Sequence, residues 1–219
     1  MVRLWCPQCH EYANNNHIQN PATNKLHCGH CKTVLVDWDQ VDEEIKRYEV
    51  VYADPPWRYE QMTVDRNRAI ENHYPTMELE EIKELDIPIA TNAVLFLWAT
   101  SPKLEEALEV LNAWGFTYRS SMIWDKQVMG MGYWFRIQHE ILLVGRRGVI
   151  KCPPIDKRIR SVIRSKRQEH SRKPDIIRSL IHQWYPDKKK IELFARDHFE
   201  DWDVYGNETP NSIQQRLEQ

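Results

Sequence analysis

Glycine is scarce in this sequence, which has only seven glycines among 219 residues. Neither of the two glycine-rich phosphate-binding patterns, G-x-G-x-x-G and G-x-x-x-x-G-K-[ST], is present. The backbone N–H groups of such loops hold the phosphates of dinucleotides and nucleoside triphosphates. We therefore expect neither of these two classes of ligand as the cofactor.

Long apolar runs and an excess of charge of one sign are also missing. The longest apolar run, AVLFLWA at 93–99, has the length of a strand, and the first residues, MVRLWCPQCH, contain no apolar core of a signal peptide. The formal net charge is only −2, so binding to a polyanion would depend on a local cluster of basic residues. We expect a soluble, cytoplasmic protein that does not contact a membrane.

Cysteine is present in small number, but its spacing is informative. Four of the five cysteines form two Cys-x2-Cys pairs, Cys6 with Cys9 and Cys28 with Cys31. Two such pairs can supply the four thiolates of a tetrahedral zinc site, and their spacing is typical of a zinc ribbon. Four buried thiols in a reducing cell are the alternative. We expect a structural Zn²⁺ in a ribbon at 1–36, which would bind nucleic acid, bind a protein partner or cap the next domain.

The remainder of the chain, 37–219, alternates apolar strands with amphipathic helices. Helices are expected to begin at Thr76, after Ser101 and at Pro174. The strands are apolar on both faces, which is typical of a sheet covered by helices on both sides. The sequence therefore predicts an α/β domain. The expected strands are 50–53, 93–99, 120–124, 140–145 and 191–195.

The stretch Asp54-Pro55-Pro56-Trp57 directly follows the first of these strands. Ligands of open α/β sheets bind beyond the carboxyl ends of the strands. Proline removes backbone N–H groups, so the Asp54 carboxylate and the Pro55 carbonyl form a rigid pair of acceptors suited to an amino group with two N–H donors. Trp57 offers a flat face for a base. The alternative is a turn that only ends the strand.

These residues and several later stretches resemble the MT-A70 family of S-adenosylmethionine-dependent adenine-N6 methyltransferases. The resemblance runs from about residue 37 to the end of the chain and implies a Rossmann-like sheet with helices on both faces. It also implies S-adenosyl-L-methionine as cofactor and adenine in nucleic acid as substrate. The stretches that carry it, besides Asp-Pro-Pro-Trp, are HYPTM (73–77), LFLWAT (95–100), SMIWDKQ (121–127), the expected hairpin GYWFRIQHEILLVGRRG (132–148), EHSRKPD (169–175), KKIELFAR (189–196), Trp202 and YGN (205–207).

The resemblance also implies roles for single residues at the acceptor. Asp54 and Pro55, with Pro56 completing the motif, would bind the target amino group, and Trp57 would stack on the adenine. Tyr74 would line the acceptor pocket, unless it only packs to anchor its loop. Trp98 and Trp124 lie inside apolar strands and are expected in the core rather than against a ligand.

A second set of residues would hold the cofactor. Lys173 would pair with its carboxylate, unless it is a solvated lysine at a helix start. Arg196 and His198 would lie near its ribose, unless Arg196 pairs with Asp197 or Glu192. Asn207 would contact the cofactor, and Asp37 or Asp39 would receive the amino group of its adenine. Phe199 and Glu208 depart from the family pattern and weaken the expected ribose contacts.

The segment 157–173 bears on the substrate, because it holds eight Lys/Arg residues and one Glu. It is either an arm that contacts phosphates, a solvated loop or an interface with another subunit. The compact chain suggests a bacterial or phage-type enzyme, and such relatives generally modify DNA. We therefore favour DNA over RNA as substrate. A non-catalytic subunit is a third reading, which the intact Asp-Pro-Pro-Trp argues against. A homodimer or a partner subunit is compatible with the sequence.

Overall fold

The chain folds into two compact units, 1–47 and 48–219, in a computed structural model. We describe each unit by itself. The residues that the structure describes are 4–6, 8–9, 11–13, 17–20, 25–28, 31–32, 34–37, 47–59, 76–132, 134–167, 172–199 and 201–205. Among them, no helix is both long enough and apolar enough to cross a membrane.

The first unit consists of short antiparallel strands. β1 (Leu4–Cys6) pairs with β2 (Glu11–Ala13), and β4 (Lys25–Cys28) lies between β3 (His17–Asn20) and β5 (Val34–Asp37). Each cysteine pair therefore begins on the last residue of a strand, β1 or β4, and its second cysteine lies in a turn.

The expected zinc site falls only partly within the described residues. The side chains of Cys6 and Cys28 lie outside them. The described side chains include no group of three or more His, Cys, Asp or Glu that could hold a metal ion. The zinc ribbon accordingly stays a prediction.

The second unit is built on a seven-stranded sheet in the order β10-β8-β9-β7-β6-β11-β12. Every strand runs in the same direction except β9, which is antiparallel to its neighbours β7 and β8. This mixed sheet with helices agrees with the Rossmann-like fold that the sequence predicts. The strands are β6 (Tyr48–Ala53), β7 (Ile89–Ala99), β8 (Thr117–Asp125), β9 (His139–Arg147), β10 (Val162–Arg164), β11 (Lys190–Leu193) and β12 (Asp203–Tyr205).

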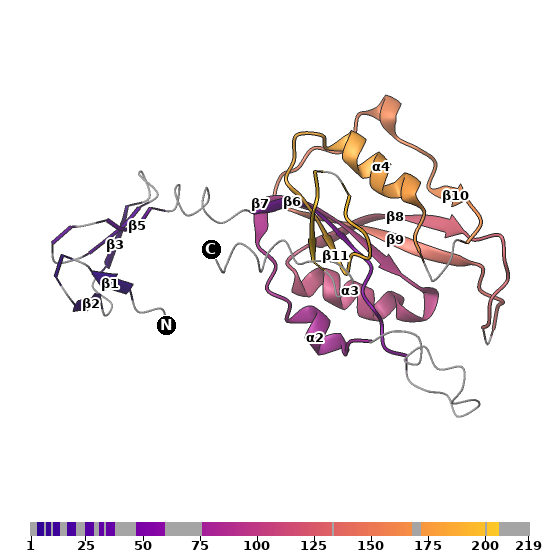
Figure 1. Ribbon diagram of the computed structural model, residues 1–219, viewed down its shortest axis with the longest axis horizontal. Helices are drawn as coiled ribbons and strands as arrows, with labels where there is room; N and C mark the ends of the chain where they lie inside the picture. Colours follow the sequence, from indigo (N-terminus) through magenta and orange to yellow (C-terminus); the bar gives the residue numbers. More distant parts are fainter. Residues whose placement is uncertain are drawn as a thin grey trace. The chain divides into compact units, whose positions relative to one another are not determined.

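Helices cover both faces of this sheet (Figure 1). α2 (Leu79–Lys83) and α3 (Leu104–Ala113) lie on one face, and α4 (Asp175–Trp184) lies on the other. The 3₁₀ turns η3 (Ser101–Lys103) and η4 (Ile155–Lys157) belong to the connections. Because successive side chains of a strand point to opposite faces, β6 contributes Val51 to the core under α2 and α3, and Val50 to the core under α4.

One helix begins later than the sequence predicts. The expected start was Thr76, but α2 begins at Leu79 behind a capping box formed by Glu78 and Glu81. The reason is a bridge between Met77 and Trp57, in which the Met77 N–H donates to the Pro56 carbonyl over 2.9 Å. The bridge keeps the chain before the helix extended and ties it to the Asp-Pro-Pro-Trp turn.

Candidate active site

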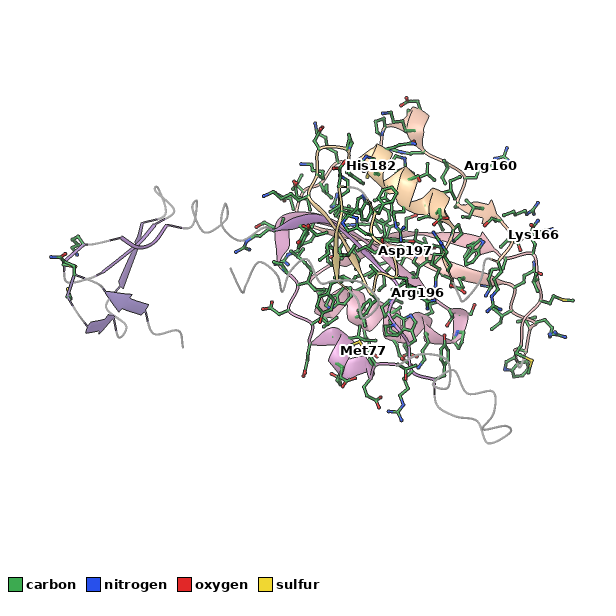
Figure 2. All side chains as sticks on the ribbon, in the orientation of Figure 1. Met77, Arg160, Lys166, His182, Arg196 and Asp197 are labelled. Atoms are coloured by element: carbon green, nitrogen blue, oxygen red, sulfur yellow. The ribbon has the colours of Figure 1, made fainter. Side chains whose placement is uncertain are left out.

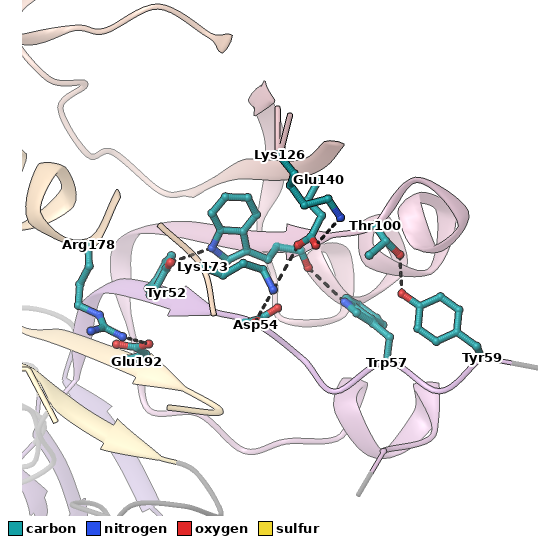
Figure 3. A network of polar contacts seen from close by, with 11 residues as sticks. Tyr52, Asp54, Trp57, Tyr59, Thr100, Lys126, Glu140, Lys173, Arg178 and Glu192 are labelled. Atoms are coloured by element: carbon teal, nitrogen blue, oxygen red, sulfur yellow. Dashed lines mark hydrogen bonds and ion pairs between the residues drawn. The ribbon is translucent and has the colours of Figure 1, made fainter. Parts of the chain in front are cut away.

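A group of polar residues of the second unit meets at the carboxyl edge of the parallel strands (Figure 3). Asp54 directly follows β6, and Thr100 directly follows β7. β9 begins at this same edge because it is antiparallel, and its second residue is Glu140. Lys173 reaches the edge from the segment that precedes α4.

Lys173 lies between two carboxylates. Its Nζ is 2.6 Å from Oδ2 of Asp54 and 3.2 Å from Oε2 of Glu140. The other carboxylate oxygen of Glu140, Oε1, lies 3.1 Å from Nζ of Lys126. The side chains of Lys173 and Glu140 are 10% and 9% exposed, whereas that of Asp54 is 30% exposed. Two acids and two lysines thus form one network, in which Asp54 is more open to solvent than Lys173 and Glu140.

Electrostatics fix the charge of the buried members. Burial by itself would lower the pKa of Lys173, but the carboxylates of Asp54 and Glu140 outweigh it and raise that pKa. Burial would raise the pKa of Glu140, but Lys173 and Lys126 outweigh it and lower that pKa. Burial raises the pKa of Asp54 against the opposing charges of Lys173 and Arg196. Lys173 and Glu140 are therefore ionised at neutral pH.

The Asp-Pro-Pro-Trp turn is anchored by its tryptophan. The Trp57 backbone N–H donates to the Pro55 carbonyl over 2.8 Å, and the indole Nε1–H donates to the Trp98 carbonyl over 3.2 Å. Trp57 is only 5% exposed. This burial differs from the exposed stacking face that the sequence predicts for Trp57. In the structure, the indole fastens the turn to the end of β7 and thereby fixes the position of Asp54.

Further polar contacts line the same edge. The hydroxyls of Tyr59 and Thr100 share a hydrogen bond of 2.6 Å, and the ammonium of Lys103 lies 5.3 Å from the centre of the Tyr59 ring. Ser101 Oγ is 3.0 Å from Nε2 of His139, at the start of β9. These contacts join the segment after the turn, the end of β7 and the start of β9 into one rim.

A second ion pair connects α4 to β11. Arg178 Nη2 lies 2.6 Å from Oε1 of Glu192 on β11. Oε2 of Glu192 and Nε of Arg178 are buried and have no hydrogen-bond partner among the described residues. Nearby, the Trp98 indole N–H donates to the hydroxyl of Tyr52 over 2.8 Å, and burial and the charge of Glu192 raise the pKa of Tyr52. Glu192 therefore pairs with Arg178 across the space between β11 and α4.

The segment after β11 faces the same edge, and Figure 2 labels its residues Arg196 and Asp197. Asp197 pairs with Arg172, with 3.4 Å between Oδ2 and Nη2. The residues before α4 therefore lie against the residues that follow β11. Arg196 is half-buried and His198 is exposed. Cationic side chains beside Asp54 fit a cofactor that carries a carboxylate. The cofactor-binding roles of Lys173, Arg196 and His198 stay predictions.

The predicted site residues separate into three groups. The structure brings together Asp54 and Lys173, with Arg196 close by. Tyr74 and Asn207 lie outside the described residues, and Asp37 ends β5 in the first unit. Trp98 and Trp124 are buried in the core, as predicted.

Sequence reasoning missed Glu140 and Lys126, although one signal was visible. Glu140 is a charged residue at the start of the apolar run EILLVG, where an acid needs a partner when it is buried. Its position became interpretable only once β9 was known to be antiparallel, because a parallel strand would have placed Glu140 at the opposite edge of the sheet.

Comparison with known proteins gives consistent matches. The profile of the MT-A70 family matches residues 48–208. A type II methyltransferase of Mycoplasma sp, M.MunI, is 34% identical over 186 residues, which cover 76% of this chain and 80% of that protein. The human N(6)-adenosine-methyltransferase catalytic subunit METTL3 is 31% identical over 180 residues, covering 74% of this chain and 28% of that protein. The Arabidopsis thaliana N(6)-adenosine-methyltransferase MT-A70-like is 33% identical over 159 residues, covering 68% and 22%. The chain thus spans about a quarter of these plant and human relatives.

Replacement of the central lysine is expected to destabilise the second unit. Lys173→Met leaves Asp54 and Glu140 without their shared partner, and loss of one member of a buried pair costs about 3 kcal/mol. Lys188→Met is the matched control, because it breaks the more exposed pair with Glu49, which is worth about 0–1 kcal/mol. Urea unfolding of both variants measures the difference. Equal losses of unfolding free energy would contradict the central position of Lys173.

The lowered pKa of Glu140 predicts a pH dependence of stability. A carboxyl whose pKa is lower in the folded state stabilises the fold above its unfolded pKa, whose ordinary value is 4.5, and this contribution is lost as the pH falls through the folded value. The difference in unfolding free energy between the wild type and Glu140→Gln should therefore be constant above about pH 4.5 and shrink below it. Unfolding curves from pH 3 to pH 7 measure it. A difference that grows towards acid would refute the ion pairs assigned to Glu140.

Proposed function

Because this chain belongs to the MT-A70 family of methyltransferases, we propose that it transfers a methyl group from S-adenosyl-L-methionine to N6 of adenine in nucleic acid. The observation that carries the proposal is the position of Asp54. Its carboxylate lies at the carboxyl edge of the sheet, is held by Lys173, and is part of a turn fastened to β7 by Trp57.

The Asp-Pro-Pro-Trp turn supplies the acceptors for the target base. The exocyclic amino group of adenine has two N–H donors, and the Asp54 carboxylate and the Pro55 carbonyl lie next to each other in the chain to receive them. The Pro55 carbonyl already accepts the Trp57 N–H, but a carbonyl oxygen has a second lone pair. Tyr74 remains the candidate for the wall of this pocket.

Asp54 orients the amino group and does not need to act as a strong base. The nitrogen lone pair of adenine is conjugated with the ring, and acceptors on both N–H bonds favour the pyramidal form whose lone pair points at an electrophile. S-adenosyl-L-methionine supplies that electrophile as a methyl group on a sulfonium, and the electrons of the broken C–S bond stay on sulfur. As N6 forms its new bond to carbon it becomes cationic, and the nearby carboxylates of Asp54 and Glu140 stabilise that charge. The proton that N6 then releases passes to Asp54, whose pKa is raised by burial.

Cationic residues around Asp54 would hold the cofactor. We assign Arg196 and His198, which follow β11, to its ribose side, and Asn207 to a further contact. Lys173 holds Asp54 and Glu140 in place, and its ammonium remains the candidate partner of the cofactor's carboxylate because it carries three N–H donors. Asp37 remains a candidate for the cofactor's adenine.

DNA is the favoured polymer. The chain spans 80% of the Mycoplasma type II methyltransferase but only 28% of the human N(6)-adenosine-methyltransferase. We favour DNA because the relative that this chain covers more fully is the one named a type II methyltransferase. RNA is the alternative, since it presents the same base edge. The human relative is named a catalytic subunit, and a homodimer or partner subunit stays a proposal for this chain.

The first unit would bind a structural Zn²⁺ through Cys6, Cys9, Cys28 and Cys31. The strand-then-turn placement of both cysteine pairs supports this, because thiolates in two such turns can complete a tetrahedral shell. We propose that the unit serves as an additional contact to nucleic acid or to a partner protein.

Removal of the Asp54 carboxylate is expected to abolish catalysis selectively. Asp54→Ala should lower the rate of methyl transfer at least about 100-fold, because a group that stabilises the transition state is lost. Binding of S-adenosyl-L-methionine should change little. Transfer of a labelled methyl group to matched DNA and RNA oligonucleotides measures the rate, and calorimetry measures cofactor binding.

The matched control for this experiment is Asp187→Ala, which removes an exposed carboxylate distant in sequence from the turn. Normal turnover by Asp54→Ala would refute the role given to Asp54. If the wild type binds the cofactor but transfers no methyl group to any adenine, the enzyme itself is the wrong proposal and the non-catalytic reading is favoured.

Metal analysis tests the zinc ribbon. Purified protein should contain about one zinc ion per chain, and Cys9→Ser or Cys31→Ser should lose most of it, since structural zinc sites need four ligands. Cys152→Ser, which changes an exposed cysteine of the second unit, is the control and should keep the metal. Protein that carries no zinc when purified without chelators would refute the predicted zinc ribbon.

A further inference from the structure

The loop between β8 and β9 exposes several large apolar side chains. Trp134 is 92% exposed and Phe135 is 83% exposed, and Met129 and Met131 are also open to solvent. Large exposed aromatic side chains in a cluster are uncommon in folded proteins and mark surfaces that bind another molecule. This aromatic tip, Trp134 and Phe135, has no role in the site described above.

The aromatic tip is held in a defined shape. The Gly130 N–H donates to the Ile137 carbonyl over 2.8 Å, and Arg136 Nε donates back to the Gly130 carbonyl over 2.6 Å. A Cβ on Gly132 would lie 2.0 Å from the Phe135 carbonyl oxygen, so only glycine permits this close approach of the chain. A preformed loop presents its side chains at a lower entropic cost on binding than a disordered one.

A basic segment lies next to the loop. The residues 157–167 include six Lys/Arg and no Asp or Glu, and all six are exposed. Within this segment, β10 pairs with β8 so that Arg164 is opposite Asp125, the last residue before the loop. The Ser165 N–H also donates to the Asp125 carbonyl over 3.3 Å. The end of the basic segment therefore leaves the sheet beside the start of the loop.

Most of these positive charges are available to a ligand. Arg164 contacts Asp125, but none of the described carboxylates forms an ion pair with Lys157, Arg160, Lys166 or Arg167. Figure 2 labels Arg160 and Lys166 on this side of the unit. Exposed cations that form no ion pair with the described carboxylates match a polyanion, and this charge favours nucleic acid over a protein as the molecule that covers the aromatic tip.

The loop is also connected to the candidate active site. Lys126, in its first turn, pairs with Glu140, which pairs with Lys173 beside Asp54. β8 is three strands away from β6, which corresponds to about 14 Å at a strand spacing of ~4.8 Å. Because base pairs of a duplex are ~3.4 Å apart, the base of the loop would lie within about four base pairs of the target adenine.

We propose that Trp134 and Phe135 enter the base stack of double-stranded DNA beside the target adenine and assist its extrusion, while the segment 157–167 holds the phosphates. This inference rests on the proposed function and names the substrate as a duplex. A paired adenine cannot reach Asp54 until it leaves the stack, and apolar side chains that separate base steps lower the cost of that movement.

Two DNA duplexes test the proposal. In one the target adenine is paired with thymine, and in the other it faces an abasic site and is already unpaired. Trp134→Ala/Phe135→Ala should lower kcat/KM at least about tenfold on the paired duplex, which matches the stacking energy of one aromatic side chain. On the abasic duplex the loss should stay within about twofold, because little unpairing remains to be assisted. Tyr118→Ala is the control, since it removes an exposed aromatic at the opposite end of β8.

Each other outcome overturns a distinct claim. Equal losses on both duplexes, or no loss, would overturn the role in extrusion and leave the methyltransferase intact. If the wild type methylates neither duplex, the proposed function fails.

Fluorescence anisotropy then tests whether the aromatic tip contacts DNA. Weaker binding of the double variant to the paired duplex alone would still support this contact, and an unchanged Kd would overturn it. Light scattering tests a third outcome. If the wild type is a dimer and the double variant is a monomer, the aromatic tip is a subunit contact and the proposal is overturned.

Discussion

One ammonium group between two carboxylates holds the candidate site together. Lys173 comes from the segment before α4, Asp54 from the end of β6 and Glu140 from the start of β9, so the three residues join parts of the chain that are far apart in sequence. The lysine stabilises both carboxylates at this edge, because an unpaired charge in a buried place is costly. The network fixes Asp54 and leaves it more exposed than its partners, which is the arrangement that a site for an amino group requires.

The direction of a single strand makes this network possible. Six strands of the sheet run the same way and present their carboxyl ends at one edge, while β9 runs the opposite way and presents its start there. Glu140 and His139 are thereby placed beside the ends of β6 and β7. The loop that enters β9 also leaves the sheet at this edge, so its exposed aromatic residues and the acceptor site are products of the same topology.

Much of this organisation could be predicted from the sequence, for identifiable reasons. Strand apolarity such as that of AVLFLWA reveals burial on both faces, and Asp-Pro-Pro-Trp after a strand reveals a rigid acidic turn at a ligand-binding edge. The sequence could not reveal that Trp57 is buried against the Trp98 carbonyl, because a motif does not show which way its side chain packs. It could not reveal the pairing of Lys173 with Glu140 either, since that contact depends on strand direction. The start of α2 was misplaced because the bridge between Met77 and Trp57 is a long-range contact that local helix signals cannot show.

The central claim is that the Asp54 carboxylate presents an adenine amino group for methylation. The most direct measurement is nucleoside mass spectrometry of DNA and RNA after incubation with the wild-type protein and S-adenosyl-L-methionine. The account predicts N6-methyl-2′-deoxyadenosine in the DNA and no methylation of other bases. Methylation only at cytosine, or on a ring nitrogen of adenine, would contradict it, because neither product requires two acceptors for an exocyclic adenine amino group.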